Sequence, residues 1–309
     1  MCLICAAAAA ATAAAAPTGA PSSAPANFIV AGFVRPVMFS AFGLNVYNYG
    51  FFVASALAGA LYVFSNDLKR ARITVDELSC FFVFLVGFAV GSKAHLAASA
   101  VGAGEELSWK SFDLRSGHSF IGSQIGAVMC MLVYIRFHRV GVFHFLDVLL
   151  PCCLLGHCIG KLGCFFSGDG CYGPPADPER VPWAMSFPNG GVPTAVPVHP
   201  TPLYESACSL LVSVLARYWQ PLPTRTTGHR TAAVLFLYGV ERMLVEQYRQ
   251  HPPIEVFGGL TEYQFLAAIL ALIGLAIEGT TPWRGTLPEL SEETSAVDEQ
   301  ASLKKKKHA

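Results

Sequence analysis

Seven apolar stretches, each about as long as a bilayer is thick, recur along this chain, and polar or Gly/Pro-rich segments separate them. A helix needs roughly 17–25 apolar residues to cross the hydrocarbon core of a membrane. Helices also satisfy their own backbone hydrogen bonds, which lipid cannot do for them. The pattern therefore predicts an all-α, polytopic membrane protein with about seven transmembrane helices, near residues 46–64, 78–101, 120–137, 144–166, 202–219, 231–248 and 261–277.

Composition supports this fold class. Of the 309 residues, 53% are hydrophobic and only 14% are charged, which is too apolar for an ordinary soluble domain of this size. The formal net charge of zero gives no reason to expect nucleic acid as a partner. Most of the ten cysteines lie within apolar runs, and no Cys-x-x-Cys pair recurs at zinc spacing, so we expect no metal site.

The chain divides into three parts. Residues 1–27 are a low-complexity Ala/Pro-rich extension without the basic region of a secretory signal, although a targeting role stays open. Residues 28–281 form the membrane domain, with room for a lipid-skimming helix near 28–42. Residues 282–309 are polar, first acidic and then lysine-rich, and we expect them to be a disordered cytoplasmic tail.

Basic residues predict the orientation in the membrane, because short cytoplasmic loops are enriched in lysine and arginine. They follow the first, third, fifth and seventh predicted spans, which would all end on the same side. We therefore expect the N-terminus and the loop 167–198 outside and the C-terminus in the cytoplasm. The residues concerned are Lys69, Arg70, Arg72, Arg136, Arg139, Arg217, Arg225, Arg230 and Lys304 to Lys307.

Polar groups gather at the end of the fourth predicted span. The stretch 160–173 contains Lys161, Asp169 and several glycines, where a membrane helix would be ending. Glycine lets a ligand approach the backbone closely, and a lysine at membrane depth usually faces a cavity, a partner or a substrate. We interpret this stretch as the floor of a lipid head-group site. Asp147 lies about 21 Å from Lys161 along a continuous helix, and it serves either this function or a helix cap on the cytoplasmic side.

The sixth predicted span carries a charged stripe. Arg242 and Glu246 are four residues apart, and Glu246 and Arg249 are three apart, so the three share a helix face. The stripe is either an ion-pair ladder or, because arginine is in excess, a phosphate site. At the start of the fifth span, Glu205 is explained by its favourable position in the first helical turn, and Tyr204 could be an interfacial anchor.

The third predicted span begins with a glycine pair. Gly122 and Gly126 are four residues apart, which gives the small-xxx-small pattern of a close helix–helix contact. His118 and Gln124 are the polar exceptions in this segment. We therefore expect the glycines to serve packing.

Six stretches in this order resemble the prolipoprotein diacylglyceryl transferase family: Tyr49-Gly50, 117–126, 147–173, 199–205, 242–249 and 259–264. The resemblance implies a membrane enzyme that moves the diacylglyceryl group of phosphatidylglycerol to the cysteine thiol of a lipobox-containing precursor protein. It also implies that no metal or cofactor takes part. Such an enzyme would lie in a bacterial inner membrane, or in the endoplasmic reticulum if the source is a eukaryote.

The resemblance also implies roles for single residues. Arg242 falls on the family's essential arginine and Glu246 on the carboxylate that orients it, while Lys161 falls on the arginine that binds the phospholipid head group. Asp169 occupies the acidic position of the glycine-rich motif. As further head-group and substrate contacts, we expect Tyr49, Asp147 and Tyr204.

Three positions depart from the family pattern. Lys161 keeps the charge of an arginine but not its planar fork, Cys164 replaces an asparagine, and Ile121 replaces a histidine. His118, one turn before Ile121, is our candidate acid/base residue. The alternative function is a non-catalytic lipid-binding or transport protein that uses the same cations on the same fold.

Overall fold

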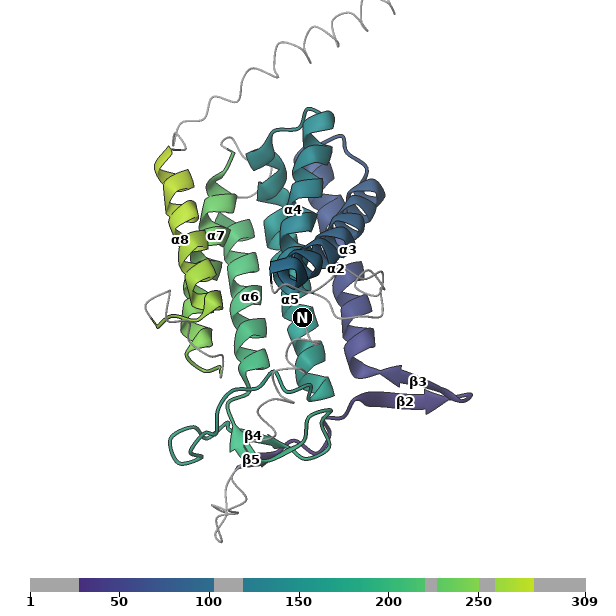
Figure 1. The fold of residues 1–309 in the computed structure, drawn as a ribbon, viewed down its shortest axis with the longest axis vertical. Helices are drawn as coiled ribbons and strands as arrows, with labels where there is room; N and C mark the ends of the chain where they lie inside the picture. Colours follow the sequence, from purple (N-terminus) through teal and green to yellow (C-terminus); the bar gives the residue numbers. More distant parts are fainter. Residues whose placement is uncertain (1–27, 103–118, 220–226, 250–258, 281–309) are drawn as a thin grey trace, which may run out of the picture.

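The computed structural model describes residues 28–102, 119–219, 227–249 and 259–280, which form seven helices and five short strands (Figure 1). The helices are α2 (Asn48–Arg70), α3 (Glu77–Gly102), α4 (Phe120–Phe137), α5 (Val142–Ser167), α6 (Thr201–Trp219), α7 (His229–Glu246) and α8 (Glu262–Thr280). Four of them, α2, α3, α5 and α8, are long and apolar enough to cross a membrane. The predicted helical membrane fold is confirmed, whereas a count of seven spans stays a prediction.

Helix α5 lies in the middle of the bundle and packs against α2, α6 and α7. Helix α7 packs in turn against α8, and α3 pairs closely with α4. Buried residues of α2, α4 and α5 such as Phe64, Ile135 and Phe145 form one apolar core. Leu154 of α5, Val212 of α6 and Val234 of α7 belong to a second core, which ties the central helices together.

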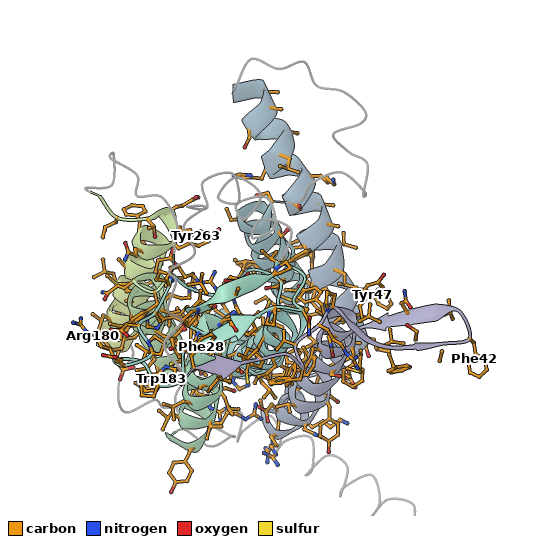
Figure 2. All side chains as sticks on the ribbon, turned by 90° about the horizontal axis from the view of Figure 1, so that it is seen from below. Phe28, Phe42, Tyr47, Arg180, Trp183 and Tyr263 are labelled. Atoms are coloured by element: carbon orange, nitrogen blue, oxygen red, sulfur yellow. The ribbon has the colours of Figure 1, made fainter. Side chains whose placement is uncertain are left out.

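The segment before α2 forms strands, so the lipid-skimming helix expected near residues 28–42 is wrong. Strand β1 (Ile29–Val30) joins β4 (Met185–Phe187) and β5 (Thr194–Val198) in one small sheet, while β2 (Val37–Ala41) pairs with β3 (Leu44–Tyr47) as a hairpin. Phe42 and Gly43 make its two-residue turn, both with positive φ, which is the geometry that the twist of a hairpin favours. Phe42 at the tip projects away from the bundle (Figure 2).

One end of the bundle gathers the parts that carry the candidate site. Here α5 and α7 end, α6 and α8 begin, and the sheet of β4 and β5 lies close by (Figure 1). Gly168 closes α5 in the left-handed conformation that suits glycine, with a φ of 59°. A Cβ atom there would lie 2.6 Å from the Cα atom of Gly190. The glycine therefore allows the chain to turn at once into the loop that carries Asp169.

Candidate functional site

A single buried carboxylate, that of Glu205 near the start of α6, binds three cations. The Lys161 ammonium from α5 lies 2.6 Å from Glu205 Oε2, and Nη1 of Arg242 from α7 lies 3.2 Å from the same oxygen. Arg249, which follows α7, donates to Oε1. Glu205 is fully buried and Lys161 almost so. The fold thus brings the predicted residues Lys161 and Arg242 to one point.

Glu246 holds Arg242 from the other side. The Nη2 group of Arg242 donates to Glu246 Oε2 at 3.0 Å, and the hydroxyl of Thr261 donates to Oε1 at 3.1 Å. The guanidinium carbon of Arg242 also lies 5.7 Å from the centre of the Tyr263 ring. These contacts fix the direction in which Arg242 presents its donors.

The charge of this cation cluster (Lys161, Arg242, Arg249 with Glu205 and Glu246) depends on a neighbour. The cluster contains three cations and two carboxylates, so these five groups together carry a net charge of +1. Glu241 is also buried and interacts electrostatically with the cluster, and neither of its oxygens hydrogen-bonds to the part of the chain that the structure describes. The cluster is therefore cationic when Glu241 is protonated and neutral when Glu241 is ionised.

His157 borders the cluster, and Tyr204, the residue before Glu205, belongs to an aromatic group of its own. The ring of His157 lies 3.9 Å from Glu205 Oε2 by Nε2 and 2.9 Å from Ser209 Oγ by Nδ1. The Tyr204 hydroxyl accepts a hydrogen bond from Trp183 Nε1 at 2.6 Å and lies 3.3 Å from His199 Nδ1. Burial lowers the pKa of His199, so its ring is neutral at pH 7. Trp183, His199 and Tyr204 thus form an aromatic group next to the start of α6.

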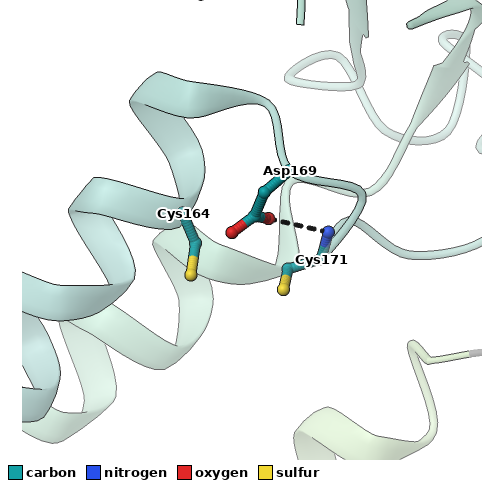
Figure 3. Close-up of side chains that lie close together, drawn as sticks. All are labelled: Cys164, Asp169 and Cys171. Carbon is teal, nitrogen blue, oxygen red and sulfur yellow. Dashed lines mark hydrogen bonds between the residues drawn. The ribbon is translucent and has the colours of Figure 1, made fainter. Parts of the chain in front are cut away.

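Asp169 lies in a second group beside Lys161. One of its oxygens accepts the backbone N–H of Cys171 at 3.0 Å. The Cys164 and Cys171 sulfurs and a carboxylate oxygen of Asp169 all lie within 4.8 Å of one another. Figure 3 shows the three side chains close together at the end of α5. The Lys161 ammonium interacts electrostatically with both thiols. The sequence spacing typical of zinc motifs did not indicate this group, because Cys164 lies in the last turn of α5 and Cys171 lies in the loop after it.

Two other predicted residues take different places. Asp147 accepts hydrogen bonds from the backbone of Gly228 and Thr231, at 2.6 and 2.8 Å, and from the Thr231 hydroxyl at 2.7 Å. It therefore caps the start of α7 at the opposite end of the bundle, and its placement as a substrate contact is corrected. Tyr49, in the first turn of α2, lies next to Gly163, where an added Cβ would be 3.6 Å from its ring. His118 lies outside the described residues.

Sequence reasoning missed the central role of Glu205. The sequence predicted a place in the first turn of a helix, where the helix dipole was a sufficient explanation. In the structure α6 begins at Thr201, and Glu205 follows its first turn. The available signal was the excess of arginine over glutamate in the stripe of Arg242, Glu246 and Arg249, which required a further anion. Nothing in the sequence placed that anion 44 residues away from Arg249.

Comparison with known proteins shows which family the chain resembles. The family model described as prolipoprotein diacylglyceryl transferase matches residues 36–278. The phosphatidylglycerol--prolipoprotein diacylglyceryl transferase of Clostridium tetani is 26% identical over 250 residues, which are 79% of this chain and 96% of that relative. Enzymes of the same name from Bordetella parapertussis and Leptospira interrogans are 35% and 33% identical over 52% and 46% of this chain, and over 60% and 44% of their own lengths. Because the matched region extends from the hairpin to α8 and includes the whole cation cluster, the chain belongs to the prolipoprotein diacylglyceryl transferase family.

Proposed function

We propose that this protein transfers the diacylglyceryl group of phosphatidylglycerol to a cysteine thiol of a lipobox-containing precursor protein. The names of its relatives supply the reaction. The observation that carries the proposal is the meeting of Lys161 and Arg242 on one carboxylate oxygen of Glu205. An anionic phosphate has the chemistry to share the donors that Glu205 now holds.

The cations would stabilise the leaving group. The thiolate sulfur attacks the terminal glyceryl carbon, its bond to the phosphate oxygen breaks, and glycerol phosphate leaves with the bonding electrons. Negative charge grows on the phosphate during this step, and preorganised donors in a site of low dielectric lower its energy. Arg242 can bind two phosphate oxygens at once, whereas Lys161 acts as a point charge.

The remaining residues would position these groups. The Glu246 carboxylate accepts one hydrogen bond from the Thr261 hydroxyl and one from Arg242. Because the first contact fixes the carboxylate, Glu246 would orient Arg242. Asp169, Tyr49 and Tyr204 would border the lipid head group, and Asp147 has no part in our proposal for the substrate. His118 remains the candidate acid/base residue for removing the thiol proton.

We infer a multi-pass integral membrane location with the N-terminus outside and the C-terminus in the cytoplasm. The cation cluster would then lie toward the outer side, where a secreted precursor arrives. The apolar helices and the basic residues after α2, α4 and α6 support this orientation. The membrane would be a bacterial inner membrane, or the endoplasmic reticulum in a eukaryote.

The test uses the purified full chain with labelled phosphatidylglycerol and a lipobox peptide. We expect a thioether-linked diacylglyceryl peptide, and we expect Arg242→Ala to lower the rate by about 100- to 1000-fold because a donor to the leaving group is lost. Arg180→Ala, in the exposed outer loop, is the control and should keep the rate. Lipid binding without product would instead support a lipid-binding or transport protein.

A further inference from the structure

The second group of side chains at the end of α5 has the make-up of a metal site. Two sulfurs and a carboxylate, from Cys164, Cys171 and Asp169, point into one common space (Figure 3). Both cysteines are buried, with exposed fractions of 2% and 3%, and Asp169 is half-buried. The group is therefore shielded from bulk water but keeps access on the side of its carboxylate.

The backbone fixes this geometry. Cys164 lies in the last turn of α5, and the left-handed Gly168 reverses the chain directly after it. Asp169 then accepts the N–H of Cys171 at 3.0 Å, which folds the loop back over the helix end. A tetrahedral ion with bonds of about 2.3 Å to sulfur separates its sulfurs by about 3.8 Å. The present spread of at most 4.8 Å needs only small side-chain rotations to reach that value.

The donor set selects the class of ion. Thiolates favour soft or borderline ions such as zinc and monovalent copper, and a carboxylate favours harder ones. A mixture of two thiolates and one carboxylate suits a borderline divalent ion that accepts four ligands in a tetrahedron. Such an ion with these three ligands leaves one negative charge. The one positive charge that the cation cluster keeps when Glu241 is protonated balances it, through Lys161, which interacts with both sulfurs.

We propose that Cys164, Asp169 and Cys171 bind a divalent ion of the zinc type, with its fourth position open to water or to an external thiol. The ion joins the end of α5 to the loop that follows it. It therefore stabilises the turn next to Lys161. This inference is independent of the proposed transfer activity, because metal binding is measured without any substrate.

The first experiment measures metal content. The full chain is purified from cells supplied with zinc, and its zinc is counted by mass spectrometry of the elements. We expect stoichiometric zinc in the wild type and its loss in the double variant Cys164→Ser/Cys171→Ser. Cys153→Ser removes an exposed thiol from the same helix and should keep the zinc. Asp169→Asn keeps both thiols and should bind zinc more weakly.

The second experiment separates binding from folding. Replacement of zinc by cobalt should give the near-ultraviolet absorption of cobalt–thiolate bonds in the wild type and in Cys153→Ser, but not in the double variant. A chelator should lower the thermal midpoint of the wild type and leave that of the double variant unchanged, since an ion that binds only the folded chain stabilises it. Equal zinc in the wild type and the double variant overturns the proposal. Mass spectrometry that finds Cys164 and Cys171 joined as a disulfide in the purified chain also overturns it.

Discussion

At the scale of single residues, Glu205 organises the site. Its two oxygens contact cations that come from α5, from α7 and from the segment after α7, and no part of its side chain is exposed. Buried cations are costly unless a partner and hydrogen bonds compensate them. Glu205 therefore stabilises three charges whose mutual repulsion would otherwise open this end of the bundle.

Removing the charge of Glu205 should destabilise the protein. Glu205→Gln leaves Lys161, Arg242 and Arg249 without their common partner, and breaking a buried ion pair typically costs about 3–5 kcal/mol. Unfolding of the purified chain in detergent measures this loss. The control Glu179→Gln changes an exposed residue of the outer loop and should stay within about 0.5 kcal/mol of the wild type. If both variants unfold alike, Glu205 does not hold the cluster together.

The sequence was informative about residues wherever spacing along one helix carried the information. Arg242 and Glu246 are four residues apart, and they form the expected ion pair. The sequence did not indicate the role of Glu205 because its partners lie on other helices. In addition, a glutamate predicted in the first turn of a helix needs no further explanation. Asp147 had two interpretations because a helix cap and a substrate contact both require an acidic side chain. The hydrogen bonds from Gly228 and Thr231 identify it as a cap, and the sequence could not place these two residues beside it.

At the scale of elements, the contact between α3 and α4 rests on glycine. A Cβ atom on Gly91 would lie 2.3 Å from the carbonyl oxygen of Gly122, and one on Gly126 would lie 2.3 Å from that of Gly87. The backbones of the two helices therefore touch. The small-xxx-small pattern of Gly122 and Gly126 predicted a close contact, and the structure confirms it.

A methyl group in this contact should push the helices apart. We expect Gly91→Ala to destabilise the folded protein by about 1–3 kcal/mol, because the new atom meets rigid backbone and not a flexible side chain. Thermal unfolding in detergent measures the effect. Gly102→Ala, at the end of the same helix, meets no atom of the described residues within 4 Å and should be neutral. Equal midpoints for the two variants would contradict the close contact.

The helices could be predicted from the sequence because the thickness of the bilayer sets the length of each apolar stretch. The secondary structure of the segment before α2 could not be predicted in this way. Residues 28–42 are apolar but too short to span a membrane, and a short apolar run suits a helix or a strand equally well. The decisive feature was local: Phe42 and Gly43 adopt positive φ and close the hairpin of β2 and β3. A phenylalanine in that conformation is unusual, so sequence rules did not favour it.

At the scale of the whole molecule, polar groups lie at the two ends of the bundle and serve different purposes. At one end, Asp67 of α2 binds Arg217 of α6 at 2.6 Å, and Asp147 caps α7. At the other end lies the cation cluster around Glu205. The first set joins helix ends, whereas in the second three cations converge on the one carboxylate of Glu205, which is why we assign the chemistry to the second end.

This division predicts which end faces which side of the membrane. Arg180, in the loop near the cation cluster, and Arg70, at the opposite end of α2, have side chains that are 87% and 69% exposed. We expect Arg180→Cys to react with a membrane-impermeant maleimide on sealed bacterial spheroplasts, and Arg70→Cys to react only after the membrane is opened. The unaltered chain gives the background from its own thiols. Arg180 pairs with Asp177 at the surface, where such pairs contribute little. Arg70 is exposed and lies 4.0 Å from the buried Asp67, whose closer partner is Arg217, so both substitutions should leave the fold intact. The reverse labelling pattern would place the cation cluster on the cytoplasmic side, away from a secreted precursor, and would contradict the proposed orientation.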